Sequence, residues 1–123
     1  MSRYWMARYK SILFAVAGIR TFFSKEVHGR LHLILALIAI SLSFLCGLNA
    51  LEWLFILLSL TLVIVTEMFN TCIERIMDYL NKNYDPRIKV IKDVAAGAVL
   101  VAAIFAIVVS AVILLPKLFD LVF

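Results

Sequence analysis

Three long apolar segments alternate with short polar stretches along the chain. About 20 apolar residues cross the hydrocarbon core of a bilayer, and a backbone in lipid must satisfy its own hydrogen bonds. The pattern therefore predicts three transmembrane helices, over residues 31–48, 51–80 and 92–115. The second continues as a polar helix beyond its apolar part, which ends near Phe69. The link between the first two is very short, which predicts a tight antiparallel hairpin, and Pro116 is expected to end the third helix.

The residues before the first span follow a different pattern. Large apolar side chains recur there at spacings of four and three, namely Trp5, Tyr9, Ile12, Val16, Ile19 and Phe23. Such spacing is typical of one face of a helix, and basic residues occupy the other faces. It predicts an amphipathic helix over residues 4–24 that lies in the headgroup plane, with a helix packed on a partner protein as the alternative. The expected fold is a single all-α membrane domain over residues 1–123.

Composition and charge agree with this interpretation. Apolar residues make up 65% of the chain and charged residues 16%, whereas soluble domains average about 45–50% and 25%. A soluble enzyme, a disordered chain and a disulfide scaffold are therefore excluded. All but Lys117 of the 12 basic residues lie before the first span or within residues 75–93, which places both regions in the cytoplasm and the C-terminus outside. The net charge of +4 then reflects topology and anionic headgroups, and no nucleic-acid partner is expected.

The polar end of the second span carries the first candidate chemistry. At about 100° per residue, four polar side chains fall within roughly 80° of arc on one helix face: Glu67, Asn70, Glu74 and Asp78. Carboxylates at a membrane boundary are costly and usually functional. Glu67 follows three β-branched apolar residues, and a carboxylate in such surroundings can take up a proton near neutral pH, as a general base must. For Asp78, an ordinary solvated acid is the alternative.

A pair of carboxylates is a candidate Mg²⁺ site. Mg²⁺ prefers oxygen ligands and usually shares them with substrate phosphates. Glu67 and Glu74 lie about 10 Å apart along one helix, too far to share one ion. Glu74 therefore needs a ligand from another segment, and Glu26 is the candidate, with an interfacial charge beside Lys25 as the alternative for Glu26.

Two further groups of residues have competing interpretations. Lys92 can neutralise phosphate charge, or it can be a topological anchor, with Asp93 favoured near a helix start in either case. His28 and His32 are spaced four apart, as metal ligands can be. No third ligand adjoins them, so interfacial histidines are favoured.

The residues quoted above also form a longer pattern. It consists of Glu67-x-x-Asn70-Thr71-x-Ile73-Glu74-x-x-x-Asp78 and, after a loop, Lys92-Asp93-x-Ala95-Ala96-Gly97-Ala98-Val99, with Gly18-Ile19-Arg20 and Glu26-x-x-x-Arg30 upstream. This pattern resembles the small bacterial integral-membrane lipid kinases of the diacylglycerol kinase and undecaprenol kinase family. The resemblance covers nearly the whole chain.

The resemblance implies a homotrimer in the bacterial cytoplasmic membrane, with active sites shared between subunits, that transfers the γ-phosphate of MgATP to a lipid hydroxyl. Glu67 matches the general base, and Glu26 and Glu74 match metal-binding acids that also meet the nucleotide. The remaining assignments are nucleotide contacts at Asn83, Tyr84, Asp85, Lys92 and Asp93, support from Asn70 and Asp78, and lipid contacts at Arg20 and Glu67.

Two departures from the family pattern are visible, and the substrate stays open. The family often has Glu or His near Asn83 and Asp85, and Phe14 replaces a common aromatic hydroxyl. The Asn70-Thr71 and Ala95–Ala98 variants are more similar to undecaprenol kinases, so undecaprenol is favoured over diacylglycerol. A small proton-coupled transporter with Glu67 as its proton site is a remote alternative. The polar face of the second span lies at its cytoplasmic end, which argues against a transporter, because transporter sites lie near the midplane.

Overall fold

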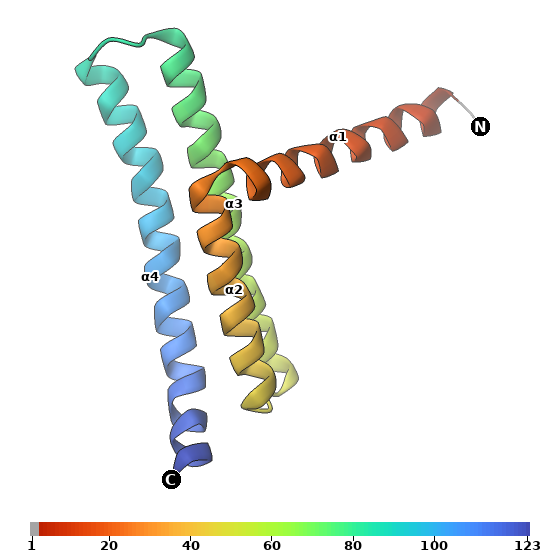
Figure 1. Cartoon of the computed structure of the whole chain (residues 1–123), viewed down its shortest axis with the longest axis vertical. Helices are drawn as coiled ribbons and strands as arrows, with labels where there is room; N and C mark the ends of the chain where they lie inside the picture. Colours follow the sequence, from red (N-terminus) through yellow and green to blue (C-terminus); the bar gives the residue numbers. More distant parts are fainter. Residues whose placement is uncertain (1–2) are drawn as a thin grey trace.

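The computed structural model describes residues 3–123, and the described chain is built from helices (Figure 1). They are α1 (Arg3–Lys25), α2 (Val27–Leu45), α3 (Ala50–Leu80) and α4 (Pro86–Val122). The last three are long and apolar enough to cross a membrane. The all-helical fold with three candidate spans is therefore confirmed. The first span, α2, begins at Val27, four residues before the predicted start at residue 31, because the helix resumes directly after Glu26.

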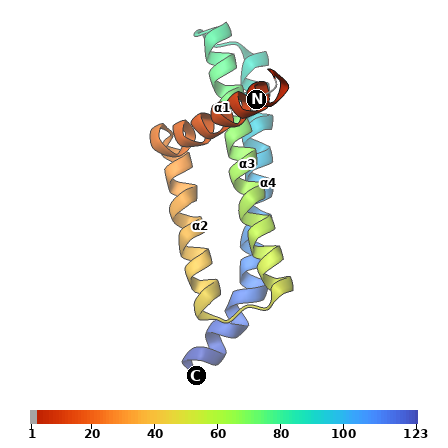
Figure 2. The same cartoon turned by 90° about the vertical axis from the view of Figure 1, so that its right-hand side faces the viewer.

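The three long helices lie side by side, and α1 projects away from them at the start of α2 (Figures 1 and 2). α3 packs most extensively against α4 and less against α2. Only 17–22% of each apolar window is buried within the chain, so most of the apolar surface faces outward. An exposed apolar surface of this extent is stable in lipid or against other apolar chains, as in a multi-pass membrane protein.

The corner between α1 and α2 depends on a glycine. Glu26 is the single residue between the two helices, and its N–H donates to the Phe22 carbonyl at 3.1 Å. Phe22 is buried, and a Cβ on Gly29 would lie 2.6 Å from the Phe22 carbonyl oxygen. The absence of a side chain at Gly29 therefore allows α1 to turn sharply off α2.

The turn between α2 and α3 forms the predicted tight hairpin. Gly47 has φ +59°, a left-handed conformation that glycine adopts without steric cost. Asn49 then caps α3: its side chain accepts from the Glu52 N–H at 3.0 Å, and the Glu52 carboxylate accepts from the Asn49 N–H at 2.8 Å. This reciprocal pair satisfies two backbone donors at the helix start and fixes where α3 begins.

The prediction that the third span ends at Pro116 is wrong, because α4 continues through it to Val122. Proline lacks an N–H and normally breaks a helix interior. Contacts on both sides of Pro116 offset that loss: Leu114 belongs to a buried cluster with Leu48 and Ile56, and Lys117 pairs with Glu52 at 3.2 Å. Figure 2 shows the end of α4 bending beneath the α2–α3 turn.

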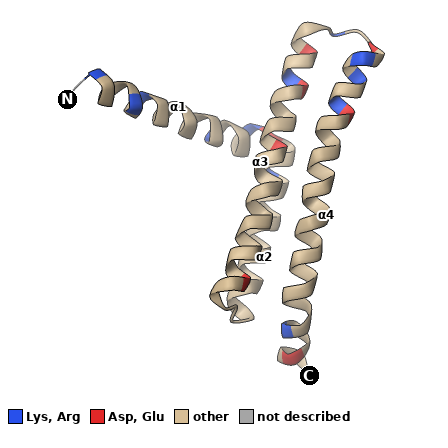
Figure 3. Cartoon of the chain, turned by 180° about the vertical axis from the view of Figure 1, so that it is seen from behind, with Lys and Arg blue, Asp and Glu red and all other residues tan. Residues whose placement is uncertain are grey.

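Most charged residues lie toward one end of the molecule, whereas Glu52, Lys117 and Asp120 lie toward the other (Figure 3). The first of these ends comprises the loop 81–85, the ends of α3 and α4 that flank it, and α1 beside them; we call it the basic end. Its Lys and Arg side chains on α3, α4 and the loop are Arg75, Lys82, Arg87, Lys89 and Lys92. Any polar substrate site of the protein is therefore expected at this end.

Candidate functional site

Glu67 on α3 is a buried carboxylate flanked by two imidazoles. Its side chain is 5% exposed. The Oε1 atom lies 4.0 Å from Nδ1 of His28, and the Oε2 atom lies 4.0 Å from Nε2 of His32. The His32 side chain is 16% exposed, whereas that of His28 is 70% exposed. The buried carboxylate thus has a sheltered partner on one oxygen and a surface partner on the other.

Sequence reasoning did not anticipate this contact, although a signal for it was present. In an antiparallel helix hairpin, residues equally distant from the turn lie opposite each other. Counted from the centre of the turn at residues 47–48, His28 and Glu67 are equally distant along the chain. His32 lies one turn further along the same face of α2. Combining the hairpin register with the spacing of four would have placed both imidazoles at Glu67.

Asn70 extends the polar face toward the basic end. It is 7% exposed, and its side-chain amide donates to Oε1 of Glu74 at 3.4 Å. Its own oxygen, Oδ1, is buried without a hydrogen-bond partner. A buried acceptor without a donor is costly, so this oxygen is suited to meet a hydroxyl, a water or a cation that enters the site.

The two candidate metal acids have different partners. Glu26, at the α1–α2 corner, forms an ion pair with Arg75 on α3, whereas Glu74 accepts from Asn70. Within residues 3–123, no group of three or more His, Cys, Asp and Glu side chains is placed to hold a metal ion by itself. A cation held by Glu26 or Glu74 therefore needs additional oxygens, which nucleotide phosphates would provide.

A cleft of about 360 Å³ lies between α1 and α3, next to the Glu26–Arg75 pair. Gly18 and Thr21 line it from α1, and Thr71 lines it from α3. Arg20, the predicted lipid contact, is exposed on the same stretch of α1. The Glu26–Arg75 ion pair thus lies at a cleft whose two walls are formed by different helices.

The loop between α3 and α4 forms a second polar cleft, of about 360 Å³. Its lining contains five of the seven residues that were assigned to the nucleotide, namely Asn83, Tyr84, Asp85, Lys92 and Asp93. The other two are Glu26 and Glu74. Asp78 also lines the cleft and pairs with Lys92 across it, while Lys89 pairs with Asp93. Residues from the end of α3, the loop and the start of α4 therefore form one charged cluster at the basic end.

Asp85 has a structural task in this cleft. As the N-cap of α4, its carboxylate accepts from the Arg87 backbone N–H at 2.8 Å and from the Arg87 guanidinium at 3.0 Å. The Arg87 side chain is the main reason why the pKa of Asp85 is lowered. Asp85 is therefore an ionised cap that fixes the start of α4.

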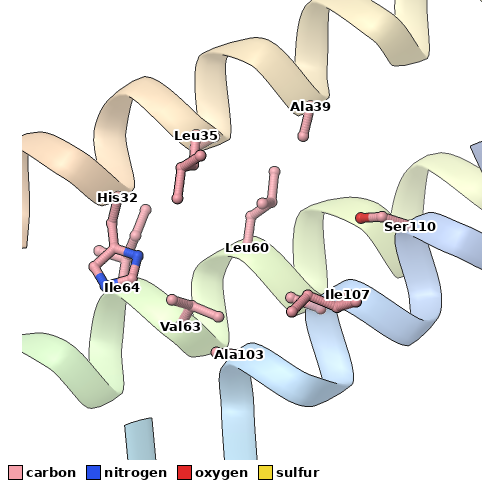
Figure 4. A pocket seen from close by; sticks show the side chains of 11 residues that line it. His32, Leu35, Ala39, Leu60, Val63, Ile64, Ala103, Ile107 and Ser110 are labelled. Atoms are coloured by element: carbon pink, nitrogen blue, oxygen red, sulfur yellow. The ribbon is translucent and has the colours of Figure 1, made fainter. Parts of the chain in front are cut away.

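An apolar cavity of about 350 Å³ lies between α2, α3 and α4 on the other side of the histidines. Figure 4 shows His32 at one end and Ser110 toward the other, with aliphatic side chains between them. α4 contributes Ala103, Ala106 and Ile107 to its wall. The buried carboxylate therefore lies along α3 between the apolar cavity, which its neighbour His32 lines, and the charged cleft, which begins at Asp78 about three turns away.

Comparisons with known proteins find related chains. The model of the family described as prokaryotic diacylglycerol kinase matches residues 13–114. A diacylglycerol kinase from Synechocystis is 35% identical over 90% of this chain, which spans 64% of that relative, just under two thirds. An undecaprenol kinase from Bacillus subtilis is 34% identical over 89% of both chains. A diacylglycerol kinase from Helicobacter pylori is 31% identical over 79% of this chain and 76% of the relative.

Proposed function

Because the chain belongs to the prokaryotic diacylglycerol kinase family, whose members are membrane lipid kinases, we propose that it transfers the γ-phosphate of ATP to the terminal hydroxyl of a membrane lipid. One observation supports this most strongly. Glu67 is a buried carboxylate at the boundary between the apolar part of α3 and its polar end: it lies beside His32, which lines the apolar cavity, and about three turns before Asp78, the first residue of the charged cleft. A lipid hydroxyl and a nucleotide phosphate have to meet at such a boundary.

Glu67 is the general base in this proposal. The lipid O–H bond breaks as its oxygen attacks the γ-phosphorus, the proton passes to the Glu67 carboxylate, and the bond between the γ-phosphorus and the leaving oxygen of ADP breaks. Phosphoryl transfer needs mainly positioning and charge neutralisation, so one aimed carboxylate and a few cations suffice. The burial of Glu67 supports this role because it keeps bulk water away from the reacting hydroxyl.

Glu74 and Glu26 are the proposed Mg²⁺ ligands, and Asn70 supports Glu74. The unpartnered Oδ1 of Asn70 and the carboxylate oxygens of Glu74 form a set of hard donors that fits this ion. Glu26 is the second proposed acid, and it forms an ion pair with Arg75, one residue after Glu74 on α3. When bound, Mg²⁺ neutralises charge on the phosphate oxygens.

The charged cleft at the basic end is the proposed nucleotide site. Lys92 offers a point charge to the phosphates, and Asp78 holds the Lys92 amine at the cleft wall in the absence of nucleotide. Asn83, Tyr84, Asp85 and Asp93 line the remainder and supply polar groups for the nucleotide. Arg20 is assigned to the lipid headgroup because it is an exposed cation on the stretch of α1 that also contributes Gly18 and Thr21 to the neighbouring cleft.

Undecaprenol is the proposed acceptor, with diacylglycerol as the second candidate. The Bacillus relative named undecaprenol kinase aligns over 89% of its own length, and the Synechocystis relative named diacylglycerol kinase over 64%. The Asn70-Thr71 and Ala95–Ala98 variants favour the same choice. The two lipids share a terminal hydroxyl on an apolar body, so Glu67 serves either.

The proposed assembly is a homotrimer in the bacterial cytoplasmic membrane, with the basic end and α1 at the cytoplasmic face. The largely outward-facing apolar surface of the three spans supports association with other copies as well as lipid contact. The basic residues of α1 support a helix that lies among anionic headgroups. Active sites shared between subunits would add walls that a single chain does not supply.

Purified protein in mixed micelles tests the proposed function. We expect labelled phosphate from MgATP to appear on undecaprenol, with slower transfer to dioleoylglycerol. Faster transfer to dioleoylglycerol would assign diacylglycerol as the substrate and overturn the choice of undecaprenol. No transfer to either lipid, together with proton uptake into vesicles that depends on Glu67, would instead indicate a transporter.

A further inference from the structure

We propose that His32 is a positioning residue for Glu67: its Nε2–H holds Oε2, so that Oε1 is the oxygen that receives the proton of the substrate hydroxyl. This inference rests on the proposed function of Glu67 as the base. It distinguishes two carboxylate oxygens that are otherwise equivalent. Nothing in the spacing of the histidines along the sequence assigns them this task.

The surroundings of Glu67 leave few alternatives to His32. Both histidines of the chain lie at this carboxylate, and among residues 3–123 no Lys or Arg nitrogen comes within 4.0 Å of it. A buried carboxylate without a donor is unstable, because burial removes the water that solvates the charge. An imidazole is therefore the available stabilising group.

The two imidazoles differ in how exposed they are, and therefore in how firmly each can hold the Glu67 carboxylate. The His28 side chain is 70% exposed in the chain, so few neighbouring side chains hold its orientation. His32 is sheltered, and the cavity wall around it consists of aliphatic side chains with Ser110 toward the far end. The described lining of that cavity contains no Asp or Glu, and Oε2 of Glu67 is the carboxylate oxygen found within 4.0 Å of the His32 Nε2.

Geometry allows the contact to become a hydrogen bond. The Nε2 to Oε2 separation is 4.0 Å, and an N–H···O bond has a length of about 2.9 Å. Catalytic hydrogen bonds are often long before substrate binds and tighten in the complex. A small rotation of either side chain closes the gap, while Oε1 stays on the side of the exposed His28, nearer the basic end.

Paired substitutions at His32 separate this role from simple packing. His32→Leu keeps an apolar body of similar size without a donor, whereas the side-chain amide of His32→Gln reaches the position of Nε2. We expect His32→Leu to lower kcat roughly ten- to a hundredfold, with the KM for ATP unchanged, because a hydrogen bond to a charged group is lost. We expect His32→Gln to recover most of that rate. Equal loss in both variants, or no loss in either, would overturn the proposal.

Two further variants serve as controls in the same assay. Ser41→Ala removes a hydroxyl from the exposed side of α2, outside the cavity and away from Glu67, and it should retain wild-type kcat. His28→Gln should lower kcat less than His32→Leu does, because His28 is exposed. A larger loss in His28→Gln than in His32→Leu would mean that the exposed imidazole holds the carboxylate.

A second measurement does not depend on kinase activity. With two histidines in the chain, nitrogen-15 spectra of labelled protein in micelles resolve both imidazoles. The proposal expects the His32 proton on Nε2 and a shift of that nitrogen in Glu67→Gln that exceeds the shift at His28. A proton on Nδ1, or a His32 resonance unmoved by Glu67→Gln, would refute the positioning role even if the kinase assay succeeds. If the assay fails with both lipids while the spectra agree, the contact stands and the proposed function fails.

Discussion

Buried polar residues, more than exposed charges, distinguish this protein at the level of single side chains. Glu67 and Asn70 are both less than one tenth exposed in a chain whose surface is largely apolar. Each is costly unless it finds a partner, and each has part of its hydrogen-bonding capacity unused. Such residues are expected where a substrate completes the polar network.

Lys92 offers a test of the nucleotide site at this scale. We expect Lys92→Ala to raise the apparent KM for ATP and lower kcat, by about tenfold or more in kcat/KM, with little change in the KM for lipid. The reason is that a lone cation can neutralise phosphate but has no geometry for a lipid tail. Steady-state kinetics with each substrate varied in turn measures both effects.

Arg87→Ala and Lys89→Ala are the matched controls for Lys92→Ala. Both side chains lie in the same turn region of the basic end, and each forms an ion pair of its own. A purely topological role would be shared among the three cations. Similar small losses of kcat/KM in all three variants would therefore indicate that Lys92 only helps to set the membrane topology, and would refute its assignment to the nucleotide.

At the scale of elements, apolar patterning predicts most of the fold. The three spans, the helix before them and the tight hairpin all follow from runs of apolar residues and a short link. The continuation of α4 past Pro116 does not, because contacts of Leu114 and Lys117 with other helices override the local effect of proline. Such contacts between helices cannot be predicted from the residues next to Pro116 alone.

The α1–α2 corner carries a prediction about stability. Gly29→Ala should destabilise the protein by about 1–3 kcal/mol, since the new Cβ would approach a backbone carbonyl at 2.6 Å and force the corner to shift. Thermal unfolding in detergent measures the loss. Gly18→Ala is the control, because a Cβ there meets nothing within 4 Å and should leave the midpoint unchanged or higher. Equal midpoints for the two variants would show that the corner is not tightly packed.

At the scale of the whole molecule, the site is an arrangement of residues from separate helices. The polar stripe of α3 could be predicted because helical periodicity alone places its members on one face. The pairing of Glu26 with Arg75 and of Glu67 with the histidines could not be read from periodicity, because it depends on how α2 lies against α3. The hairpin register supplies that information for Glu67 and His28, whereas the Glu26–Arg75 pair depends on where the α1–α2 corner lies beside α3.

The central claim is that Glu67, which lies between the apolar cavity and the charged end of α3, is the general base. Glu67→Gln keeps the size of the side chain and removes its basicity. In mixed micelles with MgATP and the preferred lipid, we expect kcat to fall by about 10²–10⁴-fold, while the mass of the assembly in detergent stays that of the wild type. A correctly assembled Glu67→Gln protein with near-normal kcat would contradict the account.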